Sequence, residues 1–317
     1  MTSDVLRLEN RDLTVIVDPG RGADVLSLTH RREQLDVLFC SPWRARADAI
    51  RAGQPPSTSD PTAGWLEQYR GGWQTLCPNA GPPRVVHGAP VGFHGEASTV
   101  PWRVASAAGD RAEMSVELFA VPVRIERTLR LEGATLRVED RLRNLSPAPL
   151  EIDYSSHPAL GGAFLDGECL IRTGARRFTS DPHTESALFV PGSEHDWPFA
   201  RTRDGDSVDL RLVPGPGAHR EVFGWLDDFT EHWASVASVQ RGLTVRVAWD
   251  GQHLPYAWLW QELNHGETFP WYGRARAIAI EPASTQTSGP GRRSVLRLGP
   301  QESIDLWLSV GIEDGRA

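Results

Sequence analysis

Apolar and polar residues alternate along many short stretches of the chain, and no segment carries a long apolar stripe with helical spacing. In residues 135–143, Leu136, Val138 and Leu142 fall on one side and arginines on the other. Alternation with a period of two is typical of a strand with one buried face. Turn residues, such as those at 18–22 and 144–147, separate these stretches. The pattern predicts an all-β fold, a large antiparallel sandwich that forms a single domain over residues 1–317.

Strands are expected from the first residues to the last. Residues 5–18 are predicted to form two short strands around a turn, and residues 150–156 a strand that leads directly into His157. The later strands are expected at residues 208–213, 221–226, 233–239, 243–249, 256–261, 275–280 and 304–310.

A long segment at about residues 40–96 interrupts this pattern. Proline, glycine and serine are frequent there, and residues 50–68 are expected to contain a helical turn at most. The segment packs glycines, an indole, an amide and a histidine into residues 71–81 and 92–96. Strands do not need that mixture, but a loop that holds a polar ligand does. We therefore predict a ligand-binding loop region.

Composition excludes several classes of function. All 33 basic side chains are arginines, which excludes Schiff-base chemistry on a lysine of this chain and a P-loop lysine. The net charge of −8, without a basic stripe, argues against a nucleic-acid partner. No apolar run is long enough for a membrane span and no signal peptide is apparent, so a soluble cytoplasmic protein, a monomer or homodimer, is expected.

Neither metal nor cysteine chemistry is indicated. The three cysteines (Cys40, Cys77 and Cys169) are widely spaced, so the sequence suggests neither a disulfide framework nor a zinc site. The histidines show no metal-binding spacing, and no cofactor motif is present. A catalytic role for Cys77 would need a neighbouring base, which only His87 or His94, brought close by the fold, could supply.

Two residues are candidates for proton transfer. His157 precedes Pro158, which favours an extended or turn conformation at the histidine. An imidazole is a suitable proton donor near pH 7, although a histidine that caps a strand end is the alternative. Glu281 follows an apolar strand and precedes Pro282. Partial burial there would raise the pKa of the carboxyl and make it a usable base; a rim carboxylate paired with an arginine is the alternative.

Most of the candidate sugar-binding residues lie in the ligand-binding loop region. His94 and Glu96 can bond to hydroxyls, and Gly95 between them allows a ligand to approach the backbone. Indoles stack on the C–H faces of sugars, and strand parity puts Trp260 on the face opposite to Gln261. The set of candidate binding residues is His94, Asn79, Arg70, Trp73, Glu96 and Trp260.

The order of these motifs resembles that of the aldose 1-epimerase (galactose mutarotase-like) superfamily. A Gly-Gly and Pro-Asn loop is followed by Gly-Phe-His-Gly with a tryptophan downstream, then by Ser-His-Pro at 156–158 and Ile-Glu-Pro at 280–282. The resemblance implies a large antiparallel β-supersandwich and a cofactor-free mutarotation of an aldose. It also implies that Glu281 is the base, His157 the acid and His94 a group that orients the sugar.

The sugar itself is open at this point. Where relatives that act on hexose 6-phosphates often carry an arginine, Glu96 follows His94-Gly95, which favours a neutral sugar. Arg70 and Arg84 flank the loop and leave a hexose 6-phosphate as an alternative. A non-catalytic carbohydrate-binding protein is the second alternative. A polysaccharide lyase or a glycosidase is a third, and the single well-placed carboxylate disfavours a glycosidase.

Overall fold

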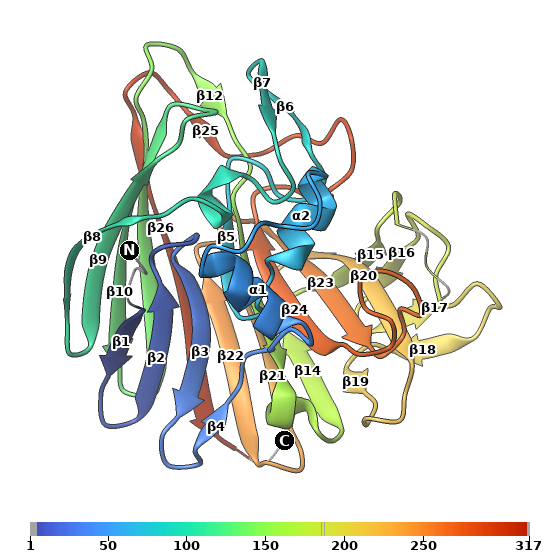
Figure 1. The fold of residues 1–317 in the computed structure, drawn as a ribbon. Helices are drawn as coiled ribbons and strands as arrows, with labels where there is room; N and C mark the ends of the chain where they lie inside the picture. The colour runs from blue at the N-terminus through green and yellow to red at the C-terminus, as the bar shows by residue number, and fades with distance from the viewer. Residues whose placement is uncertain (1–4, 185, 187, 316–317) are drawn as a thin grey trace.

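Two large antiparallel sheets carry most of the strands of the protein (Figure 1). The structure is a computed structural model that describes residues 5–184, 186 and 188–315. The first sheet has eleven strands in the order β1-β2-β3-β5-β13-β24-β23-β20-β15-β16, with β4 paired to β3. Its strands are β1 (Leu6–Glu9), β2 (Leu13–Asp18), β3 (Asp24–His30), β4 (Leu35–Asp36), β5 (Trp73–Leu76), β13 (Ser155–Gly161), β15 (Arg177–Ser180), β16 (Glu194–Asp196), β20 (Arg220–Asp227), β23 (Tyr256–Leu263) and β24 (Arg276–Ala283).

The second sheet has nine strands in the order β19-β14-β21-β22-β26-β11-β10-β9-β8. They are β8 (Arg103–Ala108), β9 (Arg111–Glu117), β10 (Val123–Glu132), β11 (Thr135–Asn144), β14 (Cys169–Thr173), β19 (Leu212–Val213), β21 (Trp233–Ser238), β22 (Leu243–Trp249) and β26 (Ser303–Asp314). Three two-stranded ribbons accompany the sheets: β6 (Arg84–Val86) with β7 (Ala89–Val91), β12 (Leu150–Glu151) with β25 (Arg297–Leu298), and β17 (Phe199–Arg201) with β18 (Ser207–Asp209).

The core lies between the two sheets and follows the predicted alternation. Leu136, Val138 and Leu142 of β11 are buried in the main hydrophobic cluster. The inward residues of the eleven-stranded sheet, such as Leu259 and Ile280, belong to the same cluster. The all-β antiparallel sandwich that the sequence predicts is confirmed, whereas the single-domain extent stays a prediction.

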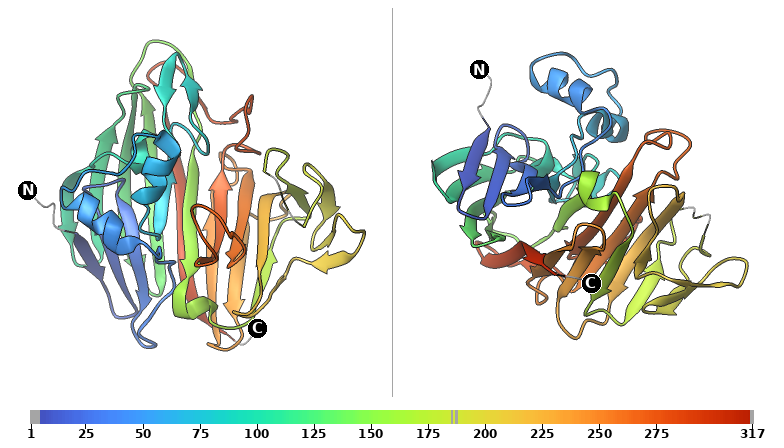
Figure 2. Two further views of the ribbon diagram at one scale, coloured as in Figure 1. Left: turned by 45° about the vertical axis from the view of Figure 1, so that its right-hand side comes forward. Right: turned by 90° about the horizontal axis from the view of Figure 1, so that it is seen from below.

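Residues 40–96 cover the outer face of the eleven-stranded sheet. Two helices, α1 (Arg44–Arg51) and α2 (Pro61–Glu67), stand over it, as Figures 1 and 2 show. The expectation of one helical turn at most was wrong. The Asp60 side chain accepts hydrogen bonds from the N–H groups of Thr62 and Ala63, and Pro61 fits the first helical turn. Two helices this short show no apolar stripe, which explains why the pattern missed them.

A second difference concerns residues 208–213, which were expected to form one strand. They are divided between β18 and β19, with a turn at 210–211. The Asp209 carboxylate accepts a hydrogen bond from the N–H of Arg211 at 3.0 Å, and this local bond competes with the ladder. The short 3-10 segments are η1 (Glu96–Ser98) and η2 (Gly162–Leu165). In the described part of the chain, no helix has the length and apolar character needed to cross a membrane.

Candidate active site

A histidine and a glutamate face each other across two neighbouring central strands. The register pairs Ser155 with Ala283 and resumes at Ala159, which places His157 opposite Glu281. Nε2 of His157 lies 3.5 Å from Oε1 of Glu281, and both side chains are almost completely buried. The two residues predicted to transfer protons therefore lie side by side on the outer face of the sheet.

Both residues lie inside strands, which corrects the prediction that each stands at a strand end. β13 continues to Gly161 and β24 to Ala283. The prediction rested on Pro158 and Pro282, because proline cannot donate a ladder hydrogen bond. Pairing between β13 and β24 is interrupted at these prolines and resumes beyond them, while β5 and β23 pair with the outer sides of the two strands. The sheet therefore tolerates the two prolines.

Burial favours the uncharged form of both members of the pair. Burial raises the pKa of the Glu281 carboxyl well above its ordinary value. Burial also lowers the pKa of the His157 imidazole to about 4. The cause is the same for both, because removal of water penalises the charged form. Oε2 of Glu281 is buried and has no hydrogen-bond partner among the described residues.

His94 contributes a neutral hydrogen-bond donor to the same site. The N–H of Gly81 donates to Nδ1 of His94 at 3.1 Å, so in this network the hydrogen of the neutral ring is on Nε2. Burial, aided by the charges of His157 and Arg292, holds the pKa of His94 well below its ordinary value. The rings of His94 and His157 are 6.1 Å apart. His94 thus offers an N–H group to a ligand and remains uncharged.

Asn79 stabilises the loop that contains Gly81 and His94, and it does not line the cavity. Its Nδ2 donates to the carbonyl oxygens of Pro82 at 3.0 Å and Gly92 at 2.9 Å. Its Oδ1 accepts from Arg292, which also bonds to Asp153 at 2.9 Å. The predicted sugar-binding role of Asn79 is therefore corrected: its amide is fully used in closing the loop.

An aromatic collar surrounds His157, formed by the rings of Trp260, Trp271, Tyr69, Trp65 and His94. The ring centroids of Trp260 and Trp271 are 5.4 Å apart, and those of Trp65 and Tyr69 are 5.1 Å apart. Trp271 and Tyr69 join the two pairs at 6.5 Å, and Trp65 contacts His94 at 4.6 Å. Trp260 lies in the cavity, as strand parity indicated, while Gln261 is fully buried on the opposite face.

Tyr69 enters the cavity where Arg70 was expected. The Arg70 guanidinium turns away and bonds to the buried Asp18 carboxylate at 2.6 Å. The Tyr69 ring is 6.1 Å from that of His157, and its hydroxyl has no partner among the described residues. Burial and the charge of Glu281 raise the pKa of the Tyr69 phenol well above its ordinary value. The sequence around Tyr69 and Arg70 shows no strand or helix period, so it does not indicate which of the two side chains points inward.

Trp73 and Glu96 also lie outside the cavity, contrary to their predicted roles. Trp73 belongs to the core between the sheets, where its indole N–H donates to Ser156 Oγ at 2.5 Å. The Glu96 carboxylate accepts hydrogen bonds from the N–H groups of Phe119 and Ala120, both at 2.8 Å. Glu96 therefore caps a distant turn and does not meet a ligand in this cavity.

The cavity has a volume of about 310 Å³ and mostly aromatic walls. Glu221, Thr184 and Ser288 are lining residues that the sequence did not single out. No arginine is among the described lining residues, which are Trp65, Leu66, Tyr69, Gly81, Pro82, Phe93, His94, His157, Thr184, Glu221, Phe223, Trp258, Trp260, Pro270, Trp271, Glu281 and Ser288. Across the described chain, no group of three or more histidine, cysteine or acidic side chains is arranged to hold a metal ion.

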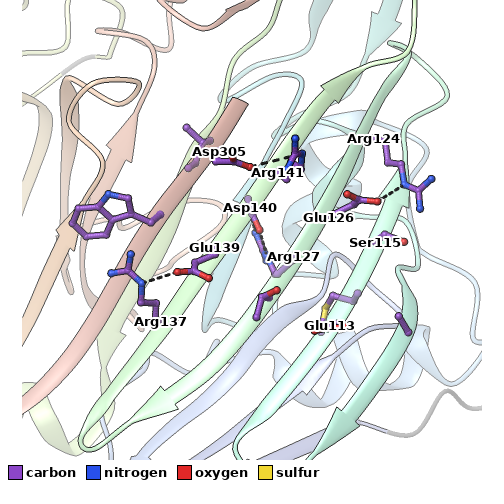
Figure 3. Close-up of a pocket in the computed structure, with 15 residues that line it drawn as sticks. Glu113, Ser115, Arg124, Glu126, Arg127, Arg137, Glu139, Asp140, Arg141 and Asp305 are labelled. Carbon is purple, nitrogen blue, oxygen red and sulfur yellow. Dashed lines mark hydrogen bonds and ion pairs between the residues drawn. The ribbon is translucent and has the colours of Figure 1, made fainter. Parts of the chain in front are cut away.

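A second hollow, of about 610 Å³, lies on the outer face of the nine-stranded sheet (Figure 3). Its charged side chains pair with their neighbours, for example Arg137 with Glu139 at 3.0 Å and Arg124 with Glu126 at 3.1 Å. Such exposed pairs form a solvated face. None of the predicted site residues lines this hollow, whereas His94, His157, Trp260 and Glu281 line the aromatic cavity.

Solved structures with the same fold are known from several organisms. Protein Slr1438 from Synechocystis sp. PCC 6803 has 19% sequence identity and a TM-score of 0.69, over 99% of this chain and 98% of its own. A galactose mutarotase-like protein from Lactobacillus casei ATCC 334 has 16% identity and a TM-score of 0.66, over 98% and 100%. A GalM/aldose epimerase homologue from C. elegans has 15% identity and a TM-score of 0.66, over 98% and 99%.

These likenesses establish the galactose mutarotase-like sandwich fold. No curated protein matches the chain. One family model matches residues 1–310, and its description is that of a domain of unknown function. The chain belongs to this family, the domain of unknown function DUF4432.

Proposed function

We propose that the protein is an aldose 1-epimerase that interconverts the α and β anomers of an uncharged aldose without a cofactor. The single observation that supports this most is the contact between His157 and Glu281 at 3.5 Å in an aromatic cavity. A hemiacetal opens when one group removes the proton of the anomeric hydroxyl while another protonates the ring oxygen. Aromatic walls suit the C–H faces of a sugar ring.

His157 and Glu281 together hold the same number of protons before and after mutarotation. In the reacting form, Glu281 is a carboxylate and His157 an imidazolium, which together hold as many protons as the neutral resting pair. Glu281 takes the proton of O1, His157 gives its proton to O5, and the C1–O5 bond breaks to leave an aldehyde. Rotation about C1–C2 and the reverse transfers close the ring as the other anomer. The pair ends with the same total number of protons, so no external acid or base is consumed.

The electrostatics favour an uncharged sugar. Two carboxyl groups, those of Glu221 and Glu281, line the cavity, and the described lining contains no arginine. Arg70, the candidate for a phosphate contact, is bound to Asp18. Arg84, the second candidate, pairs with the buried Asp153 carboxylate at 2.8 Å. A phosphate placed among these carboxyl groups would lack a charge partner.

The test is the rate of anomer exchange of freshly dissolved aldoses, followed by polarimetry and by NMR. We expect the protein to accelerate the anomer exchange of at least one neutral aldose above the rate in buffer. The acceleration for hexose 6-phosphates should be smaller. An unchanged exchange rate for every sugar would overturn the epimerase proposal. Acceleration confined to sugar phosphates would overturn the preference for an uncharged substrate.

Tyr69→Phe provides a separate prediction about the reacting end of the cavity. The Tyr69 phenol is the one group of the aromatic collar whose polar atom is buried and unpartnered among the described residues. We expect loss of its hydroxyl to lower kcat/KM for anomer exchange about 10- to 100-fold, the value of one hydrogen bond to a charged group. Tyr256→Phe, a change outside the cavity, is the matched control. Equal kcat/KM for both variants would show that Tyr69 only packs.

A further inference from the structure

Three side chains that were predicted to bind the sugar are already occupied by the protein. The Asn79 amide closes its own loop, the Glu96 carboxylate caps a turn, and the Arg70 guanidinium is paired with a buried carboxylate. None of the three lines the cavity. A ligand therefore meets neither an amide side chain nor a guanidinium among the described lining residues.

The walls of the cavity present carbon to the ligand. The indole N–H of Trp65 donates to Ser98 Oγ at 3.0 Å, and that of Trp258 donates to the carbonyl oxygen of Thr285 at 3.0 Å. Both indoles therefore expose ring carbons and no free donor. Phe93 and Phe223 add further apolar rings to the walls. A sugar hydroxyl that points at these walls loses its water and gains no hydrogen bond.

Carboxyl and hydroxyl groups are few among the described lining residues. Tyr69 and Glu281 lie with His94 and His157 around the place where proton transfer requires the anomeric carbon to lie. Glu221, Thr184 and Ser288 are the other described lining residues with a carboxyl or hydroxyl group. An ordinary hexopyranose carries hydroxyls around the whole ring, so some of them would face carbon.

We propose that the preferred ligand of this cavity is a deoxyaldose, a sugar in which at least one hydroxyl remote from C1 is replaced by hydrogen. As a substrate assignment, this inference rests on the proposed function. As a statement about binding, it rests on the walls alone. A hydrogen in place of an unsatisfied hydroxyl removes a desolvation penalty and adds apolar contact with the indole and phenyl rings.

The experiment compares matched pairs of sugars on the intact protein. D-galactose is compared with D-fucose, D-glucose with 6-deoxy-D-glucose, and L-mannose with L-rhamnose, each pair differing only in the hydroxyl at C6. Binding is followed by tryptophan fluorescence, since Trp65, Trp260 and Trp271 line the cavity. Anomer exchange is followed by NMR. We expect at least one deoxy sugar to bind about 5- to 100-fold more tightly than its parent, with a matching fall in KM.

A variant pair tests whether the walls are the cause. Phe223→Asn adds a hydrogen-bonding group to the cavity and should reduce the deoxy preference at least about threefold. Phe119→Asn changes a side chain that is 96% exposed and outside the cavity, and should leave the preference unchanged. An equal effect of both variants would contradict the assignment to the walls.

The outcomes separate this inference from the proposed function. If exchange is accelerated but every parent binds at least as tightly as its deoxy analogues, the deoxyaldose assignment is overturned and the epimerase stands. If deoxy sugars bind preferentially and no exchange is accelerated, the ligand class stands and the epimerase is overturned. If no sugar binds or reacts, both are overturned.

Discussion

Replacement of Glu281 by glutamine is expected to lower kcat for anomer exchange about 10²- to 10⁴-fold while KM changes little. The amide has the size of the protonated carboxyl and keeps one hydrogen-bond donor, but it cannot take up the proton of O1. Burial raises the pKa of the Glu281 carboxyl and so favours its neutral form. A neutral amide therefore fits the buried position without a new desolvation cost. The measurement is kcat and KM from NMR exchange rates of the best sugar.

Glu221→Gln is the matched control for this prediction. Glu221 also lines the cavity, but it lies on β20 and makes no contact with His157. Its loss is expected to change KM more than kcat, because it can bind a hydroxyl and takes no proton in the cycle. If both variants lose the same fraction of kcat, the loss is due to the removal of a carboxyl group from the cavity in general. The assignment of Glu281 as the base would then be wrong.

The fold was predictable because alternation is a local property. Leu136, Val138 and Leu142 show their burial in the sequence itself, and hairpin partners lie close along the chain. The same rule failed at Pro158 and Pro282, where it placed strand ends. Proline usually marks an edge or an end of a strand, and only the long-range pairing of β13 and β24 with their outer neighbours makes two central prolines tolerable.

The site was predictable in part, for a different reason. His157, Glu281 and His94 came from motif order, and the structure brings them to one cavity. Their contact depends on a strand register between residues more than a hundred positions apart in the sequence. The sequence could not show that Tyr69 lines the cavity and Arg70 does not. The buried Asp18 carboxylate that binds Arg70 comes from a strand far away in the sequence.

A buried ionic network between the two sheets supports the site from behind. Arg127 on β10 bonds to the Asp140 carboxylate at 2.8 and 2.6 Å, and it reaches Thr75 Oγ1 on β5 at 2.6 Å. The Tyr154 hydroxyl donates to the same carboxylate at 2.6 Å. Thr75 is adjacent to the residue that pairs with His157 across β5 and β13. The network therefore fixes the strand next to His157.

Asp140→Asn is expected to destabilise the protein by about 3–5 kcal/mol, because it leaves the Arg127 guanidinium buried without a countercharge. The measurement is the free energy of unfolding in urea. Asp305→Asn is the matched control, since Asp305 meets Arg141 on the exposed sheet face at 3.9 Å and should cost at most about 1 kcal/mol. Equal losses for the two variants would show that the inter-sheet network contributes no more than a surface pair. A large loss of unfolding free energy confined to Asp140→Asn would instead show that Arg127 depends on its buried partner. Without the carboxylate, the buried Arg127 guanidinium has neither water nor a countercharge to offset its desolvation.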